Sequence, residues 1–493
     1  MEHISGHKVS PMRATWVTIE RCLGGRPRCS QTLGLVVAFA VLLALRFSPA
    51  MPGLKPDAQT VLGVFLWFII TMVTNALPMA IVGLTAPLLL VLLGHTKIPQ
   101  AFNAFDTDIF FLAAGAFLIA AVMMGTPLGR RITLTIADLM KSRRVTRMLL
   151  GLSLAEVVTH PVIPVVNETA LFLPMCKGVT ALMGDRGDPA EIRRINTAVM
   201  YLIAGVLPLF IGPLILTSHF PNLILAAYLK STRHITITWL QWFWMNLPLW
   251  GLLPIVYFYV VRYFRLKDVE IPGLDAGIEK MKRDLGPITV GEIWALICLT
   301  VGMVFWITGW IKPGMTALLV AGLMFVPGGQ IDFEEISRHV LWDILMLLGG
   351  AISLGTVLYR SGAVSWVAQG LVNPIQAQHL PLLAVLFVLA FALHIARAGI
   401  VSAVASGAAF VPLVAGIATA LGYHELPFSL VLINCLSYAF FLPTSITAFL
   451  IAWGASKTTA WEAIKFGAPL SVIANVFVLL VQPVWLRMIG LPI

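Results

Sequence analysis

The chain has 493 residues, of which 59% are hydrophobic and only 11% are charged, and its formal net charge is +10. Because soluble proteins carry about 25% charged residues, this composition excludes an ordinary soluble domain and indicates a helical membrane protein. The positive charge would suggest a nucleic-acid partner in a soluble protein. Here it fits basic cytoplasmic loops, so the expected partner is the lipid bilayer and not nucleic acid. The five cysteines are scattered and are expected to be free thiols.

The apolar segments predict an all-α polytopic membrane protein with about 11 transmembrane segments, because a spanning helix needs about 20 apolar residues. The predicted spans are 32–47, 57–76, 78–94, 108–125, 195–229, 239–262, 290–311, 315–327, 341–359, 427–455 and 466–487. Proline and polar residues interrupt two of them, about 195–229 and about 427–455, which are therefore predicted to be broken helices. Two further apolar runs, about 145–184 and about 380–420, have ionisable residues near their middles. Such residues favour re-entrant hairpins that are buried in protein.

One segment of the chain occurs twice, as Asp108-Ile-Phe-Phe-Leu-Ala-Ala-Gly-Ala116 and as Asp343-Ile-Leu-Met-Leu-Leu-Gly-Gly-Ala351. Each copy is followed by an amphipathic stretch, a predicted hairpin and a predicted broken helix. An odd number of predicted crossings separates the copies, so they run in opposite directions and form an inverted repeat. We expect a first repeat at 32–262 and a second at 290–493. Duplicated units with broken segments at matching places are typical of secondary transporters.

Basic residues gather on one side of the predicted membrane. They occur in the N-terminal segment 1–31 and again at 130–147, 193–194 and 262–283. The positive-inside rule makes these regions cytoplasmic, which puts the N-terminus in the cytoplasm and the C-terminus outside. We expect a multi-pass protein of the cell inner membrane, with 263–289 as the cytoplasmic linker between the repeats.

The first predicted hairpin is polar at its centre, which reads His160-Pro-Val-Ile-Pro-Val-Val-Asn167-Glu168-Thr169. The prolines end one half-helix, and Asn167 or Thr169 can cap the next, whose free N–H groups would form an anion site. Glu168 is expected near the bilayer midplane, where a carboxylate is costly and usually functional. It could bind a cation, titrate a proton or pair with an arginine; a structural ion pair is the alternative.

The second predicted hairpin places Arg397 in the middle of an otherwise uncharged apolar run. A planar guanidinium is suited to bidentate binding of a carboxylate, sulfonate or phosphate. The alternative is a structural pair with Glu168, which substrate could break. His394 and His160 fall at similar places in the two hairpins. A buried histidine is usually a hydrogen-bonded core residue, although either of these could titrate.

The two interrupted helices would supply the other walls of the site. The first break reads Thr217-Ser218-His219-Phe-Pro221-Asn222, and the second reads Leu442-Pro443-Thr444-Ser445-Ile-Thr447. Proline frees backbone carbonyls, while serine, threonine and asparagine offer further oxygens. Unwound carbonyls coordinate Na⁺ in transporters of this design. An ordinary proline kink is the alternative interpretation.

These motifs resemble the divalent-anion:sodium symporter (DASS) family of the ion-transporter superfamily, over roughly residues 100–480. The strongest match is His219-Phe-Pro221-Asn222-Leu-Ile, at the position of the family's Pro-Pro-Asn break. The chain is a divergent member by this comparison, because Asn167-Glu168-Thr169 stands where the first Ser-Asn-Thr motif is expected. In the second motif only Ser402 matches. The resemblance implies a homodimer, elevator-type alternating access, and substrates such as dicarboxylates, citrate or sulfate.

The sequence therefore predicts a secondary transporter for a small anion, coupled to Na⁺ or H⁺, with no catalytic residues and no organic cofactor. The expected substrate ligands are Asn167, Thr169, Arg397, Ser402, Thr444 and Ser445. The expected ion-coupling residues are Glu168, Ser218, His219, Asn222 and His394, with Asn167 and Asn222 as candidate Na⁺ ligands. A cation/proton antiporter of the same superfamily is the main alternative. A membrane-embedded enzyme would need a clustered metal or acid–base set, and a channel would need a continuous pore.

Overall fold

The computed structural model describes residues 28–140, 142–183, 188–376 and 380–493, and over these ranges the chain is helical, with a single isolated bridge between Arg144 and Glu270. Eight of the described helices are long and apolar enough to cross a membrane. Shorter apolar helices lie between them. The fold is thus that of an all-α polytopic membrane protein, as predicted. Most of the predicted N-terminal segment, 1–31, lies outside the described residues.

The helices before the linker are α2 (Arg28–Phe47), α3 (Pro56–Val73), α4 (Met79–Leu92), α5 (Ile98–Ala101), α6 (Asp108–Gly125), α7 (Leu128–Leu139), α8 (Val145–Thr159), α9 (Val165–Ala181), α10 (Pro189–Val199), α11 (Leu207–Ile211), α12 (Phe220–Arg233), α13 (Trp239–Asn246) and α14 (Leu252–Tyr263). Between α10 and α11 runs a buried π-helical segment, η2 (Met200–Val206). Helix α8 and helix α9 together fill the run expected as the first hairpin. The helices α10 to α12 form the first broken helix, with its break at 215–219.

The remaining helices are α15 (Leu274–Arg283), α16 (Val290–Thr308), α17 (Pro313–Met324), α18 (Phe333–Ser337), α19 (Trp342–Ser361), α20 (Ala363–Gln376), α21 (Leu382–Arg397), α22 (Ala403–Leu421), α23 (Glu425–Ser437), α24 (Thr447–Ser456) and α25 (Ala460–Met488). The order of elements repeats that of the first half. A long helix (α19) is followed by an amphipathic one (α20), a helix pair (α21 and α22) and a helix broken at 438–446 (α23 and α24).

The duplicated Asp-Ile segments form the first turns of α6 and α19, and each helix packs closely on a helix from the other half. Helix α6 lies against α17, and α19 lies against α4. Gly115 and Gly350 occupy matching positions in the two segments. A Cβ at Gly115 would run into the Ala317 backbone, and a Cβ at Gly350 would run into the Gly83 backbone. The duplicated glycines therefore permit close contacts between the halves.

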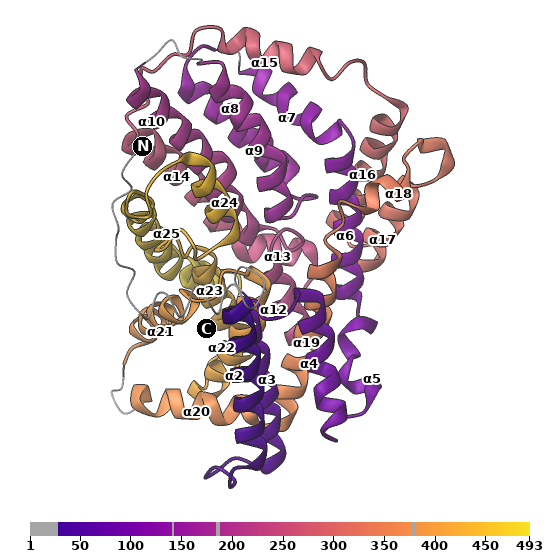
Figure 1. Cartoon of the computed structure of the whole chain (residues 1–493), viewed down its shortest axis with the longest axis vertical. Helices are drawn as coiled ribbons and strands as arrows, with labels where there is room; N and C mark the ends of the chain where they lie inside the picture. Colours follow the sequence, from indigo (N-terminus) through magenta and orange to yellow (C-terminus); the bar gives the residue numbers. More distant parts are fainter. Residues whose placement is uncertain (1–27, 141, 184–187, 377–379) are drawn as a thin grey trace, which may run out of the picture.

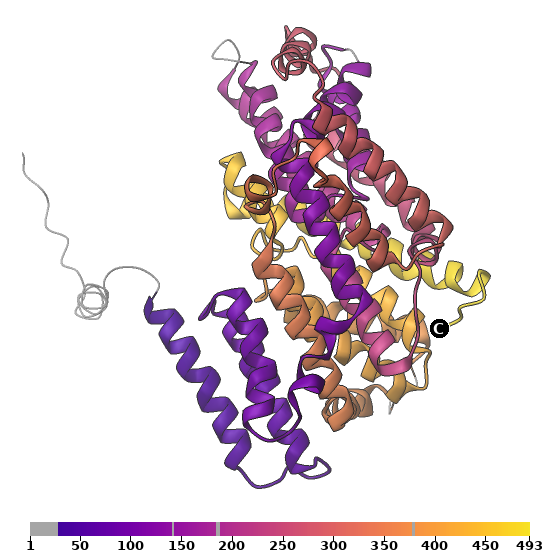
Figure 2. The same cartoon turned by 90° about the vertical axis from the view of Figure 1, so that its right-hand side faces the viewer.

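The amphipathic helices α7 and α20 lie at opposite ends of the molecule (Figure 1). Helix α7 carries α15, which belongs to the predicted linker, and Lys282 of α15 pairs with Asp138 of α7 at 3.0 Å. At the other end, Trp366 of α20 donates to the Pro52 carbonyl in the loop between α2 and α3. Figure 2 shows α2 and α3, in indigo, beside the lower part of the bundle.

Candidate substrate and ion site

The first hairpin turns at residues 160–164, where α8 ends at Thr159 and α9 begins after Pro164. Pro164 is the N-cap residue, and no side chain caps α9. The expectation that Asn167 or Thr169 caps this half-helix was therefore wrong. Proline sets the start of the helix because its φ suits a helix entrance and it has no N–H that needs a partner. Asn167 instead lies inside the helix, where its Nδ2 is 3.0 Å from Met124 Sδ.

The tip of the first hairpin is bonded to the break of the first broken helix. The Ser218 hydroxyl donates to the His160 carbonyl at 2.6 Å, and the Thr217 hydroxyl donates to the Pro161 carbonyl at 3.0 Å. The Val165 amide returns a bond to the Ser218 carbonyl at 3.1 Å. Two predicted sequence motifs are thus one structural unit, in which each segment satisfies backbone groups that the other leaves free.

Asn222 is fully buried just after this break and holds the end of the preceding half-helix. Its Nδ2 donates to the carbonyls of Gly212 and Ile215, at 3.0 and 2.9 Å. Its Oδ1 has no hydrogen-bond partner within the described ranges. The Oδ1 atom of Asn167 and the hydroxyl of Thr169 are likewise buried without a described partner.

Glu168 is fully buried and has two partners from the end of α8. Its Oε1 accepts a bond from the Thr159 hydroxyl at 2.7 Å, and its Oε2 contacts His160 Nδ1. A second carboxylate of this hairpin, Glu156, was missed by the sequence reasoning. It is also fully buried, and neither of its oxygens has a partner in the described structure. Its position four residues before His160, on the same helix face, was the signal that could have revealed it.

At the second tip, Arg397 ends α21 and is only 1% exposed. Its Nη1 donates to the Ser406 hydroxyl on α22 at 2.9 Å, whereas Nε and Nη2 lack partners among the described residues. Ser402 is the N-cap of α22 and accepts a bond from the Ala405 amide at 3.3 Å. Across the described ion pairs, Glu168 and Arg397 are not joined to each other.

His394 lies three residues before Arg397 on α21 and has partners of its own. Its Nδ1 is 2.6 Å from the Ala390 carbonyl, and its Nε2 is 3.3 Å from Asn475 Nδ2 on α25. Both ring nitrogens are therefore occupied. His394 and Asn475 line an apolar groove of about 370 Å³ between α21 and α25.

The second break repeats the contact seen at the first, because Thr447 at the start of α24 donates to the Val401 carbonyl in the second tip at 3.4 Å. Of the two hydroxyls predicted to bind substrate here, Ser445 is buried and Thr444 is exposed. The Phe440 amide in this break donates to Ser471 of α25 at 2.6 Å.

The two halves meet beside the first break. His219 Nδ1 lies 3.3 Å from the Ser437 hydroxyl of α23. One residue after Ser406, a Cβ at Gly407 would lie 3.2 Å from Pro221 Cα, so α22 packs directly on the start of α12. The first tip, the first break and the second hairpin thus form a continuous buried polar region made by both halves.

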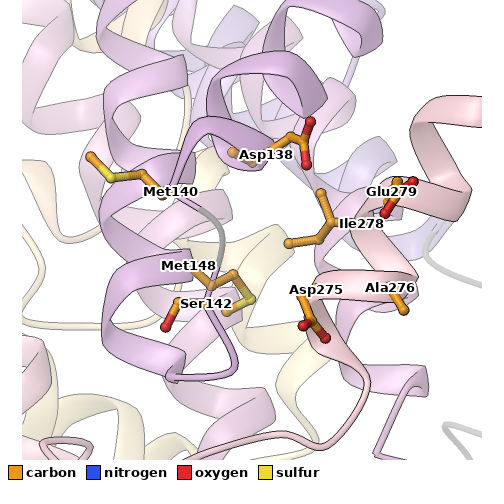
Figure 3. Close-up of a pocket in the computed structure, with 9 residues that line it drawn as sticks. Asp138, Met140, Ser142, Met148, Asp275, Ala276, Ile278 and Glu279 are labelled. Atoms are coloured by element: carbon orange, nitrogen blue, oxygen red, sulfur yellow. The ribbon is translucent and has the colours of Figure 1, made fainter.

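A separate hollow of about 230 Å³ opens between α7, α8 and α15 (Figure 3). Asp138, Asp275 and Glu279 line it together with Ile278 and two methionines. Each of these carboxylates pairs with a basic side chain, Asp138 with Lys282, Asp275 with Arg143 and Glu279 with Arg283. The positive charges at this hollow are therefore already compensated, and the hollow does not suit an anionic substrate.

The described residues include no group of three His, Cys, Asp or Glu side chains able to hold a metal ion. With its broken helices, paired hairpins and buried polar centre, the fold is of the kind found in secondary transporters. The family model described as the sodium:sulfate symporter transmembrane region matches residues 29–491. The chain belongs to this family, and its members are multi-pass membrane proteins of the DASS type, as the sequence motifs predicted.

Several relatives match over most of their length. A protein named "Membrane protein" from Cupriavidus necator is 26% identical, over 94% of this chain and 94% of its own length. The sodium-dependent dicarboxylate transporter SdcS of Staphylococcus saprophyticus is 26% identical, over 92% of this chain and 90% of SdcS. The L-tartrate/succinate antiporter of Escherichia coli K12 is 24% identical, over 79% of this chain and 83% of the antiporter.

Among solved structures, the YdaH transporter of Alcanivorax borkumensis superposes with a TM-score of 0.51 at 13% sequence identity. The match covers 88% of this chain and 99% of YdaH. At this identity the likeness concerns the fold alone.

Proposed function

We propose that this protein is a secondary active transporter that moves a small anion of the di- or tricarboxylate, sulfate or sulfonate class by elevator-type alternating access. The observation that carries the proposal is the free edge of Arg397. Ser406 holds Nη1, while Nε and Nη2, which share one edge of the guanidinium, have no partner in the described part of the chain. That edge binds a carboxylate or sulfonate in bidentate fashion, and a buried charge without a partner is costly. A substrate anion would remove that cost.

The polar side chains of the two tips and the second break favour a substrate anion that has more than one polar group. The hydroxyl of Thr169 is buried without a described partner, and Ser402, Thr444 and Ser445 offer further hydroxyls near the second tip and break. The amide of Asn167 would add a donor on the side of the first hairpin. The relatives named for dicarboxylate and for tartrate and succinate favour dicarboxylates as first substrates to test.

The coupling ion would be Na⁺ or H⁺. The free Oδ1 atoms of Asn167 and Asn222 are candidate Na⁺ ligands, and SdcS is named as sodium-dependent. We assign the protein to the inner membrane as a homodimer, with the N-terminus cytoplasmic and the C-terminus outside, and with inverted repeats at 32–262 and 290–493. A cation/proton antiporter is the second candidate function, because Glu168 is fully buried beside His160.

Uptake into proteoliposomes tests the proposal. Labelled succinate, citrate and sulfate are offered under an imposed Na⁺ or H⁺ gradient, and at least one is expected to accumulate. Failure of all three under both gradients would contradict anion transport, and cation-driven proton exchange in the same vesicles would establish the antiporter instead.

Replacement of Arg397 tests the role of its free edge. Losing two charge-assisted hydrogen bonds, each worth about 1.5–3 kcal/mol, should weaken succinate binding by at least about 100-fold in Arg397→Ala. Arg397→Lys keeps the charge but not the bidentate edge, and we expect it to remain strongly impaired. The matched control is Arg360→Ala, because Arg360 is exposed at the end of α19. Unchanged affinity in Arg397→Ala, measured on protein that elutes normally in size-exclusion chromatography, would make Arg397 a structural residue.

A further inference from the structure

His219 is fully buried in the first break, and one nitrogen of its ring is open. It is the N-cap residue of α12, but its side chain makes no capping bond. Its Nδ1 lies 3.3 Å from the Ser437 hydroxyl of α23, and its Nε2 has no hydrogen-bond partner within the described ranges. Buried polar atoms nearly always have a partner. Nε2 is therefore a position that can hydrogen-bond a ligand inside the protein.

On the side of the second hairpin, the surroundings of His219 are positively charged. Arg397 is near enough to interact electrostatically with the ring. Ser406 holds Arg397 by a hydrogen bond, and a Cβ at the next residue, Gly407, would lie only 3.2 Å from Pro221 Cα at the start of α12. The N-terminus of α12 adds the partial positive charge of its helix dipole. Since a second buried cation beside a guanidinium would be costly, the His219 ring is neutral, and these groups favour an anion as ligand.

Ser437 can direct the hydrogen of the His219 ring to Nε2. A neutral imidazole carries its hydrogen on one nitrogen only. The Ser437 hydroxyl lies 3.3 Å from Nδ1 and 3.2 Å from the Ile433 carbonyl, and its single hydrogen can serve either acceptor. When Ser437 donates to Nδ1, the ring hydrogen is on Nε2, which then becomes a donor. An anion at Nε2 needs a donor and therefore favours this arrangement.

Resting on the proposed function, we infer that His219 is a specificity-determining substrate ligand, whose Nε2–H binds one anionic end of the substrate while the free edge of Arg397 binds the other. The two ligands come from α12 and α21, in opposite halves of the chain, so an anion with two separated charged ends bridges them. A dicarboxylate has two such ends, whereas sulfate has a single charged centre. The sequence grouped His219 with the ion-coupling residues, but a nitrogen that carries hydrogen has no lone pair for a cation.

The experiment measures how succinate, its monoamide succinamate and sulfate compete with labelled succinate for exchange in proteoliposomes that contain the full-length protein. The wild type should bind succinate more tightly than either competitor. In His219→Ala the affinity for succinate should fall by at least about tenfold, because a hydrogen bond to a charged group is lost. Succinamate keeps one carboxylate for Arg397 but has a neutral second end. Its affinity should fall less, so the preference for succinate over succinamate should shrink by about fivefold or more.

Two conservative variants separate the two ring nitrogens. The amide nitrogen of His219→Gln falls near the place of Nε2, whereas that of His219→Asn falls near Nδ1. The glutamine variant should keep most of the preference for succinate, and the asparagine variant should behave like His219→Ala. His424→Ala is the matched control, because His424 is also an N-cap residue without a capping bond but is exposed, at the start of α23. It should leave all three affinities unchanged.

Three outcomes would overturn the inference: an unchanged preference in His219→Ala that elutes normally in size-exclusion chromatography, a preference kept by His219→Asn and lost by His219→Gln, or a wild type that binds sulfate or succinamate as tightly as succinate. If His219→Ala does not fold, the glutamine and asparagine variants decide, and failing these the wild-type preference does. Each of these results leaves anion transport standing. A wild type that exchanges none of succinate, citrate and sulfate would instead count against the proposed function itself.

Discussion

Ser406 is a small residue whose hydroxyl fixes the orientation of the only charged group at the second tip. It accepts from Arg397 Nη1 and in turn donates to the Ala403 carbonyl at 2.9 Å. The serine therefore ties the guanidinium to the first turn of α22. A guanidinium held in this way loses less freedom when it binds an anion, which raises affinity.

Ser406→Ala should raise the succinate KM by about tenfold, because a hydrogen bond to a charged group is worth about 1.5 kcal/mol or more. The maximal exchange rate should change less, since Arg397 itself remains. The measurement is the concentration dependence of succinate exchange in proteoliposomes. Ser361→Ala is the matched control, because the Ser361 hydroxyl donates to the Leu358 carbonyl and accepts from the Ala363 amide, both close to it in the chain. A KM that stays at the wild-type value would mean that Ser406 does not position Arg397.

For single residues, the sequence predicted a site residue well where one charge interrupts an apolar run. It predicted the hydrogen-bond partners of such residues poorly. Arg397 could be singled out because it interrupts an apolar run. Its partner Ser406 could not, since many serines fall at helical spacing in such runs. The start of α9 was misjudged because the choice between Pro164 and the nearby Asn167 as N-cap depends on where the turn closes. That closure depends on contacts with Ser218, far away in the sequence.

Among the helices, the packing of α19 against α4 requires a close approach of their two backbones. Gly350 faces the Gly83 backbone, and a side chain there has no flexible neighbour to displace. Gly350→Ala should therefore lower the free energy of unfolding by about 1–3 kcal/mol, as overpacking does in dense interiors. Thermal unfolding of the purified protein in detergent, followed by tryptophan fluorescence, measures the shift.

Gly370→Ala in α20 is expected to leave the free energy of unfolding unchanged or to raise it. A Cβ at Gly370 meets open space, so the substitution adds no clash and removes the flexibility of glycine within a helix. Its melting temperature should equal or exceed that of the wild type. Equal destabilisation by both substitutions would show that packing between α19 and α4 is not what requires Gly350.

The order of the helices could be predicted, because each long apolar run and each interruption can be recognised from a short stretch of the sequence. The helix pair α8 and α9 covers 145–181, where the sequence predicted a hairpin at about 145–184. The pair α21 and α22 covers 382–421, against a predicted 380–420. The contacts between each tip and its break could not be predicted, because they join segments more than forty residues apart. The helix within the linker, α15, was also not foreseen.

For the whole molecule, the separation of α7 and α20 has a direct consequence for sidedness. They lie at opposite ends of the bundle (Figure 1), and an inverted repeat would place them on opposite membrane surfaces. Basic residues such as Arg143, which is largely exposed, gather at the end that carries α7 and α15. The positive-inside rule therefore predicts that this end is cytoplasmic.

Cysteine labelling in intact cells tests this arrangement. Cys22 and Cys29 are first changed to serine, while Cys176, Cys298 and Cys435 are buried. A membrane-impermeant maleimide should then label Gln369→Cys in α20 from outside. It should label Arg143→Cys only after the cells are permeabilised. Labelling of both positions from the same side would contradict the inverted repeat.

In the π-helical segment η2 (Met200–Val206), the number of residues matters more than their identity for the orientation of the chain that follows. A π turn holds one residue more than an α turn, so η2 amounts to a single-residue insertion in an otherwise α-helical span. Deleting one residue from it would turn the wide turn into an α turn, which also completes one full rotation, so the residues downstream would keep their direction. Inserting one residue that winds as α-helix would instead rotate everything downstream by about 100°, and Ser218 and Asn222 would then point away from the first hairpin, although neither had been altered. Related chains one residue shorter in this buried stretch should therefore keep the contact between the first break and the hairpin tip, with regular α winding in place of η2.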